Sequence, residues 1–282
     1  MPDMTPDTTP DMTNEPFFFI QLSDPQLGLT AEKTDLSKEE GLAQEVAQFE
    51  SAVAEANRLK PDFVVVTGDL CQHHLDSAEV AEVKRIAGGL DSEIPIYWTT
   101  GNVDSGLDDG VPVPSMLAKY REEFGDDYYS FDHKGTTFIA ISSTVIFDPS
   151  QTQDELEAQM EFIESELKAS VERGVGNRII FTHHPLFTDD PNEEDAGTNL
   201  PLVRRNSLLE LFRKYDVSAV FAGHLHRNNY ASDGDMLMVV TTAVGWQGGD
   251  DDPGYRVVKV LPNGIEHQYY PFSSGSDSVQ LS

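Results

Sequence analysis

The chain reads FFFIQLS at residues 17–23, DFVVVTGD at residues 62–69 and IPIYWTTGN at residues 94–102. Helical patterns near 39–59 and 76–88 separate these three short apolar runs. Alternation of apolar strands with helices is typical of βαβ units, in which neighbouring strands run parallel. The sequence therefore predicts an α/β protein whose N-terminal part contains a parallel sheet.

The rest of the chain continues the alternation of strands and helices. We predict helices at 113–124, 152–173 and 202–214, and strands near 128–132, 136–142, 178–184 and 218–224. A Thr-x-x-Glu pattern at Thr152 and Glu155 predicts a capping box for the second of these helices. We expect a long loop at 185–201, and a run of strands at 236–271 with turns at Pro253-Gly254 and Asn263-Gly264. This number of elements fits two packed sheets flanked by helices.

The two ends of the chain differ in composition from its middle. Residues 1–15 repeat Pro, Asp and Thr, and residues 273–282 are mostly small and polar. Neither segment has an apolar face to bury. We therefore expect a disordered leader at 1–15, one domain at 16–272 and a flexible tail at 273–282.

The composition excludes several classes of protein. The 282 residues are 39% hydrophobic, and 19 Lys and Arg against 49 Asp and Glu give a formal net charge of −30. A field of this sign repels nucleic-acid phosphates, so we expect no nucleic-acid partner. No apolar run approaches the roughly 20 residues of a membrane span, so we expect no membrane partner. The N-terminus lacks the order of a secretory signal, which makes a cytoplasmic location the expectation.

Side chains that can bind metal ions follow five of the predicted core strands. They are Asp24, Asp69, Asn102, the pair His183 and His184, and the pair His224 and His226. Because the carboxyl ends of strands meet at one edge of an α/β sheet, these side chains can converge. Taken singly, a strand-end Asp is most often a turn or cap residue, and a His pair can be structural. Five such signals in succession favour a metal site with oxygen and imidazole donors.

Five motifs, in their order and spacing, resemble the signature of the calcineurin-like metallophosphoesterases. They are Ser-Asp-Pro-Gln at 23–26, Gly-Asp-Leu at 68–70, Gly-Asn-Val-Asp at 101–104, Thr-His-His at 182–184 and Gly-His-Leu-His at 223–226. The resemblance is closest to a subgroup with Asp-Pro-Gln in the first motif, Gly254-Tyr255-Arg256 late in the chain and a closing His267 to Tyr270. Some members of that subgroup are protein serine/threonine phosphatases. The resemblance implies a four-layer α-β-β-α sandwich with two metal ions.

The resemblance also implies a role for each motif residue. The first metal would be held by Asp24, Gln26 and His226, the second by Asn102, His183 and His224, and both by Asp69. The ions, Mn, Fe, Zn or Mg, would activate a bridging water as hydroxide for attack on phosphorus. The predicted function is hydrolysis of a phosphomonoester, either a phosphorylated small molecule or a phosphoprotein. A phosphodiesterase, or a metal-binding protein without turnover, are the alternatives.

Two positions depart from the family pattern. Gln26 stands where most members have a histidine, and an amide oxygen is a weaker donor that favours oxygen-loving ions. Val103 replaces the histidine thought to protonate the leaving oxygen, a contribution typically worth about 10²–10⁴-fold. Activity of this chain is therefore expected to be weakened for poor leaving groups.

The remaining candidates concern the reaction itself. Asp69, Asn102 and His184 are the candidate catalytic residues, and Arg227 and Asn102 are the candidate substrate contacts. His184, His73 and His74 are the histidines near enough to the motifs to replace the missing acid.

Overall fold

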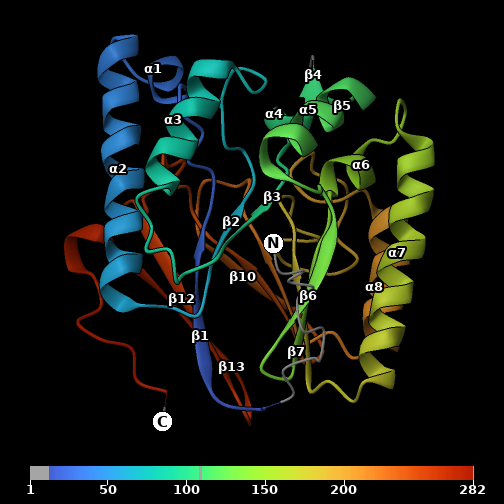
Figure 1. Ribbon diagram of the computed structural model, residues 1–282. Coiled ribbons are helices and arrows are strands. Elements are labelled where there is room, and N and C mark those ends of the chain that lie inside the picture. The colour runs from blue at the N-terminus through green and yellow to red at the C-terminus, as the bar shows by residue number, and fades with distance from the viewer. Residues whose placement is uncertain (1–12, 108–109, 282) are drawn as a thin grey trace, which may run out of the picture.

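A computed structural model describes residues 13–107 and 110–281 of the chain. Two mixed β-sheets pack face to face, and helices cover both outer faces (Figure 1). Three buried clusters of hydrophobic side chains fill the space between the resulting four layers. The predicted α/β class and the α-β-β-α sandwich are confirmed. Most of the predicted disordered leader, residues 1–12, lies outside the described residues.

The first sheet is built around the three apolar runs that open the domain. Its strands are β1 (Phe17–Leu22), β2 (Val64–Thr67), β3 (Ile96–Thr99), β12 (Gly254–Leu261) and β13 (Gly264–Pro271). They lie in the order β13-β12-β1-β2-β3. The strands β1, β2 and β3 are parallel, as predicted, whereas β12 and β13 add antiparallel neighbours. Helices α2 (Lys38–Leu59) and α3 (Ser77–Ala87) cover the outer face (Figure 1).

The second sheet has a parallel centre and antiparallel edges. Its strands are β6 (Tyr129–His133), β7 (Thr136–Ala140), β8 (Asn177–Phe181), β9 (Ala219–Ala222), β10 (Asn229–Asp233) and β11 (Met236–Val240). They lie in the order β10-β11-β9-β8-β7-β6, and only the outer pairs are antiparallel. Helices α7 (Gln153–Glu172) and α8 (Leu202–Lys214) cover its outer face (Figure 1). The edge strand β10 was not predicted, because its sequence NYASD lacks an apolar alternation.

Short elements gather at one end of the sandwich, beyond the carboxyl ends of β1 and β2 (Figure 1). They are α1 (Thr30–Lys33), α4 (Asn102–Ser105), α5 (Pro114–Phe124), α6 (Ser143–Phe147), β4 (Gly106–Leu107) and β5 (Val111–Pro112). Only α5 among them was predicted. The 3₁₀ helix η1 (Phe272–Ser274) follows β13, and residues 185–201 form the predicted loop without a helix or strand.

One predicted helix cap is wrong. Thr152 precedes α7 with φ −139° and ψ 38°, and its side chain makes no capping hydrogen bond. A capping residue needs extended backbone to turn its oxygen toward the helix N–H groups. Glu155 instead accepts from Arg121 at 2.8 Å. A capping box does open α2, where Ser37 and Glu40 exchange hydrogen bonds.

The tail was expected to be flexible. Its described part lies against α2, because Arg58 donates to the carbonyl oxygens of Ser276 and Asp277. Val279 and Leu281 pack on the cluster between α2 and the first sheet. The flexibility of residues 273–282 stays a prediction.

Aromatic side chains dominate the space between the two sheets. Successive residues of β1 point to opposite faces, so Phe17 and Phe19 enter this space while Phe18 and Ile20 face the helices. The ring of Phe19 is 0% exposed and stacks on Phe63 with 4.9 Å between ring centroids. Edge contacts with Phe181 and other rings of the second sheet surround it. The edge contacts between Phe19 and the rings of the second sheet fix the alignment of the two sheets.

We expect Phe19→Ala to lower the free energy of unfolding by about 3–5 kcal/mol, because it leaves a cavity between the sheets. Urea unfolding followed by circular dichroism measures the change. The control is Val203→Ala, whose side chain is 80% exposed and which should stay within about 0.5 kcal/mol of wild type. A loss below about 1 kcal/mol for Phe19→Ala would contradict this account of the core.

Candidate metal centre

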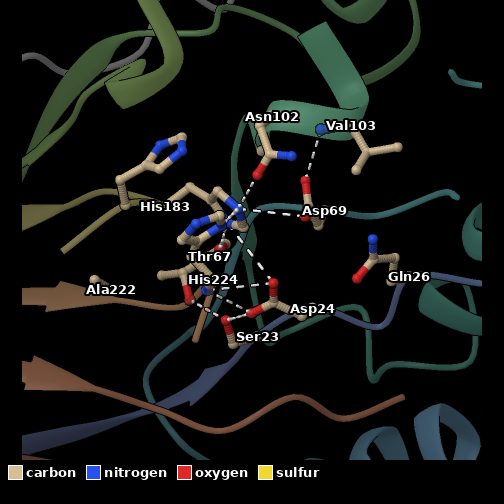
Figure 2. A network of polar contacts seen from close by, with 12 residues as sticks. Ser23, Asp24, Gln26, Thr67, Asp69, Asn102, Val103, His183, Ala222 and His224 are labelled. Carbon is tan, nitrogen blue, oxygen red and sulfur yellow. Dashed lines mark hydrogen bonds and ion pairs between the residues drawn. The ribbon is translucent and has the colours of Figure 1, made fainter. Parts of the chain in front are cut away.

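The predicted ligand residues lie together where strands of both sheets end, and Figure 2 labels all of them except His226. Asp24 follows β1, Asp69 follows β2, Asn102 opens α4 after β3, His183 follows β8, and His224 and His226 follow β9. The side chains of Asp24, Asp69, His183 and His226 are buried. Residues separated by two hundred positions in the sequence thus share one small volume, as the positions of the motifs predict.

His183 is the centre of one group of donors. Its Nε2 lies 3.0 Å from Asn102 Oδ1, 3.3 Å from Asp69 Oδ2 and 3.2 Å from His224 Nδ1 (Figure 2). Its Nδ1 lies 2.9 Å from the carbonyl oxygen of Thr67, which can only accept, so Nδ1 carries a proton. When the ring is neutral, Nε2 has no hydrogen, and its lone pair faces the lone pairs of the neighbouring ligand atoms. Such an arrangement fits a cation placed between the donors.

A second group of donors shares Asp69 with the first. Ligand atoms of Asp24, Asp69 and His226 lie within 4.8 Å of one another, as do those of Asp69, His183 and His224. His226 Nδ1 donates to the carbonyl oxygen of Trp246 at 2.5 Å, which leaves Nε2 on the side of Asp24, 3.4 Å from its Oδ1. Asp69 is therefore placed to contact ions in both groups.

Gln26 borders the second group. Its Nε2 donates to Gln72 Oε1 at 2.9 Å, whereas its Oε1 is buried and has no hydrogen-bond partner in the part of the chain that the structure describes. Figure 2 shows this oxygen on the side of the amide that faces Asp24. A buried acceptor without a donor is costly. A cation bound beside Asp24 would satisfy it, so the residues present fit a metal ion.

The charges in the centre perturb its histidines and carboxylates. Burial alone would lower the pKa of His183, but the carboxylates of Asp69 and Asp24 outweigh it and raise the pKa to about 10. Burial opposes ionisation of Asp24 as well, yet His226 and His183 hold the pKa of that carboxyl below its usual value. Burial and His183 together lower the pKa of His224 to about 4. The centre therefore favours positive charge at His183 Nε2, whether from a proton or from a metal cation.

The backbone is unusual at the ligands. Positive φ values, between 35° and 70°, occur at Asp24, Gln26, Asp69, His224 and His226. Residues other than glycine adopt this conformation at a cost of roughly 1–3 kcal/mol each, and it clusters at functional sites. Glycines allow the loops to approach so closely, since a Cβ on Gly101 would lie 2.0 Å from Asp69 Oδ1 and one on Gly223 1.8 Å from Ser23 Oγ.

Asp104 and Ser143 support the centre without belonging to either group. Asp104 is buried and accepts from the backbone N–H groups of Leu70 and Gly101, at 2.9 and 2.8 Å, so it braces the loops after β2 and β3. Ser143 was missed, because nothing in the residues around it marks a serine that accepts from the backbone N–H groups of His183 and His184.

His184 lies against the centre. Its ring is buried, stacks on Phe147 and lies 4.3 Å from that of His224. Ser143 Oγ accepts two backbone N–H bonds, so its own hydrogen points to His184 Nδ1, 3.0 Å away. The proton of His184 is then on Nε2. Burial and the neighbouring His224 keep the pKa of His184 well below its usual value, so the ring is neutral.

Three other predicted residues lie outside the two groups of donors. Arg227 is exposed and directly follows His226. His73 is held by Glu79, with Nδ1 to Oε1 at 2.5 Å, and His74 Nδ1 lies 3.0 Å from the carbonyl oxygen of Gly106. Within the described ranges, neither of these two histidines is among the clustered ligand atoms.

Comparisons with known proteins agree with this geometry. A family model described as calcineurin-like phosphoesterase matches residues 19–228. The serine/threonine-protein phosphatase CPPED1 of Danio rerio is 36% identical over 272 residues, covering 93% of this chain and 87% of the relative. The human protein of that name is 33% identical over 273 residues, covering 93% and 86%. The crystal structure of a dimetal phosphatase from Danio rerio shares the fold, with a TM-score of 0.66, 14% identity and coverage of 94% and 97%.

The fold, the clustered donors and these relatives define a hydrolase of phosphoric esters that depends on metal ions. The chain belongs to the calcineurin-like phosphoesterase family. The resemblance seen in the motifs is thereby confirmed, and phosphorylated compounds are the substrates of the family.

We expect Gly101→Ala to destabilise the protein by about 1–3 kcal/mol, because the added methyl group collides with the carboxylate and backbone of Asp69. Urea unfolding of metal-free protein measures this. Gly176→Ala is the matched control, since a Cβ there meets its nearest atom only at 3.7 Å. Equal stability of the two variants would contradict the close packing of the loops.

Proposed function

We propose that this chain is a phosphomonoesterase with two divalent cations, and that it removes phosphate from phosphorylated serine or threonine side chains of proteins. The observation that carries the proposal is the convergence of ligand atoms of Asn102, Asp69 and His224 on His183 Nε2, beside a second group that shares Asp69. The choice of substrate is supported by the relatives named serine/threonine-protein phosphatase, which are similar along almost their whole length.

Each ligand residue is assigned to one ion or to both. Asp24, Gln26 and His226 would hold the first ion, Asn102, His183 and His224 would hold the second, and Asp69 would serve both. When bound, such ions polarise phosphoryl oxygens and acidify a water molecule for attack on phosphorus. The backbone N–H of Val103 donates to Asp69 Oδ1 at 2.9 Å and so fixes the orientation of the shared carboxylate.

Substrate contacts follow from the same geometry. Because Asn102 Oδ1 faces His183, the Nδ2 of its amide is left to donate to a phosphoryl oxygen. Arg227 is the second proposed contact, since its exposed guanidinium follows His226 and guanidinium pairs with phosphate in a bidentate manner. In a chain with a formal net charge of −30, these donors and the ions supply the local attraction for an anion.

The leaving oxygen receives less help than in a site with a well-placed acid. The side chain of Val103 has no proton to give, and His184 is the buried histidine nearest the donors. Its low pKa makes the imidazolium scarce at neutral pH, although Nε2–H of the neutral ring is a hydrogen-bond donor. Esters with good leaving groups should therefore react faster than alkyl esters.

The first experiment compares p-nitrophenyl phosphate with bis-p-nitrophenyl phosphate on metal-stripped protein reloaded with manganese. We expect manganese-dependent hydrolysis that favours the monoester, and a loss of at least about 10²-fold in Asp69→Asn, because the shared carboxylate holds both ions. Release of phosphate from a phosphoserine peptide tests the substrate class.

Three results would contradict the proposal. A preference for the diester would make the chain a phosphodiesterase. Turnover that survives in Asp69→Asn would place the reaction elsewhere. Protein that binds two manganese ions and hydrolyses none of these compounds would be a binding protein instead.

We expect Val103→His to raise the rate on a phosphoserine peptide by at least about 10-fold and to leave p-nitrophenyl phosphate nearly unchanged. A donor at this position protonates an alkoxide, whereas p-nitrophenolate leaves without protonation. Val103→Leu is the control for a change of volume. An equal change on both substrates would show that no acid is missing.

A further inference from the structure

We propose that Gln72 is a positioning residue of the metal centre, which orients the amide of Gln26 so that Oε1 faces the first ion. This inference rests on the metal assignments proposed above. It concerns the one ligand position at which the chain departs from the histidine of its family.

The backbone brings the two glutamines together. Gln26 N–H donates to the carbonyl oxygen of Asp69 at 2.9 Å, and Gln72 N–H donates to that of Leu27 at 3.0 Å. An isolated parallel bridge joins Leu27 and Cys71 between them. The segments 26–27 and 69–72 therefore run side by side, and the side chains of Gln26 and Gln72 meet.

The two ends of an amide have nearly the same shape but opposite chemistry. An ion can accept electron density from Oε1, whereas Nε2 presents hydrogens that repel it. Nothing in the shape of a glutamine side chain chooses between the two orientations. A partner with a defined hydrogen-bonding character has to make the choice.

A chain of hydrogen bonds makes this choice. Gln72 Nε2 donates to Glu32 Oε2 at 3.0 Å, and Gln26 Nε2 donates to Gln72 Oε1 at 2.9 Å. A carboxylate only accepts, so Glu32 fixes the direction of Gln72, and Gln72 fixes that of Gln26. Reversal of Gln26 would bring its Oε1 against Gln72 Oε1. The unpartnered oxygen beside Asp24 is the result of this direction.

The imidazole ligands are held by the same principle. His183 and His226 each donate from Nδ1 to a backbone carbonyl, of Thr67 and Trp246, and each turns Nε2 to the centre. Gln72 orients the amide ligand by a hydrogen bond, as these carbonyl oxygens orient the imidazole ligands. Loss of such a supporting partner typically costs about 10–100-fold in metal affinity.

Calorimetric titration of metal-free protein with manganese tests the inference by its dissociation constants. Gln26→Ala first identifies which constant belongs to the ion beside Gln26. We expect Gln72→Leu to raise the same dissociation constant by about 10-fold and to leave the other within about 2-fold. The melting temperature of the metal-free protein should fall by no more than about 4 °C, because only the hydrogen bonds of one side chain are lost. The matched control is Gln153→Leu, an exposed glutamine of α7 that also donates to a glutamate, Glu157, at 3.1 Å.

A double variant separates positioning from a general structural role. In the Gln26→Ala background, Gln72→Leu should cause no further loss, because the residue that it orients is absent. The inference would be overturned by equal weakening of binding in both backgrounds, or by unchanged dissociation constants in Gln72→Leu or in Gln26→Ala. A rise of both dissociation constants together with a large fall in the melting temperature would also overturn it. Wild-type protein that binds no manganese would overturn the proposed metal centre itself, and this inference with it.

Discussion

The structure depends on one electrostatic constraint, the gathering of buried acceptors in a small volume. The carboxylates of Asp24 and Asp69 face imidazole nitrogens of His183 and His226 at 3.3–3.4 Å, shielded from water. Isolated charges are expensive in such a place unless an opposite charge compensates them. The pKa values of His183 and His226 rise and that of Asp24 falls, all toward attraction of positive charge. Metal cations, which the family uses, would supply the positive charge that these buried carboxylates need.

The sandwich supplies the rigidity that such a centre needs. Behind the ligands, Gln21 of β1 donates to Thr67 of the same sheet and to the carbonyl oxygen of Ala222 in the other, at 3.1 and 2.9 Å. Thr241 donates to Gln21 Oε1 and accepts from the buried guanidinium of Arg256. These buried polar contacts join the two sheets directly below the ligands. They complement the aromatic contacts of Phe19 farther down, so the strand ends keep a fixed spacing.

The sequence predicted more of this site than of its surroundings, for physical reasons. Apolar runs marked the central strands, and each was followed by a side chain with a donor atom, so Asp24, Asp69, Asn102, His183 and His224 could be placed at one sheet edge. The supporting partners could not be found. Thr67 and Trp246 act through carbonyl oxygens, which every residue has, and Gln72 is an ordinary glutamine until the fold sets it beside Gln26. The cap at Thr152 failed because backbone geometry overrode residue type.

The ligands of the proposed second ion come from both sheets, with Asn102 after β3 and His183 and His224 after β8 and β9. The binding site that these residues form exists only while the two sheets are packed. The binding energy of the ion therefore adds to the stability of the native state. A ligand at 100 times its dissociation constant contributes about 2.7 kcal/mol in this way. The concentration of metal would then determine how often the chain unfolds, even when no substrate is present. It would therefore also determine how resistant the chain is to proteolysis.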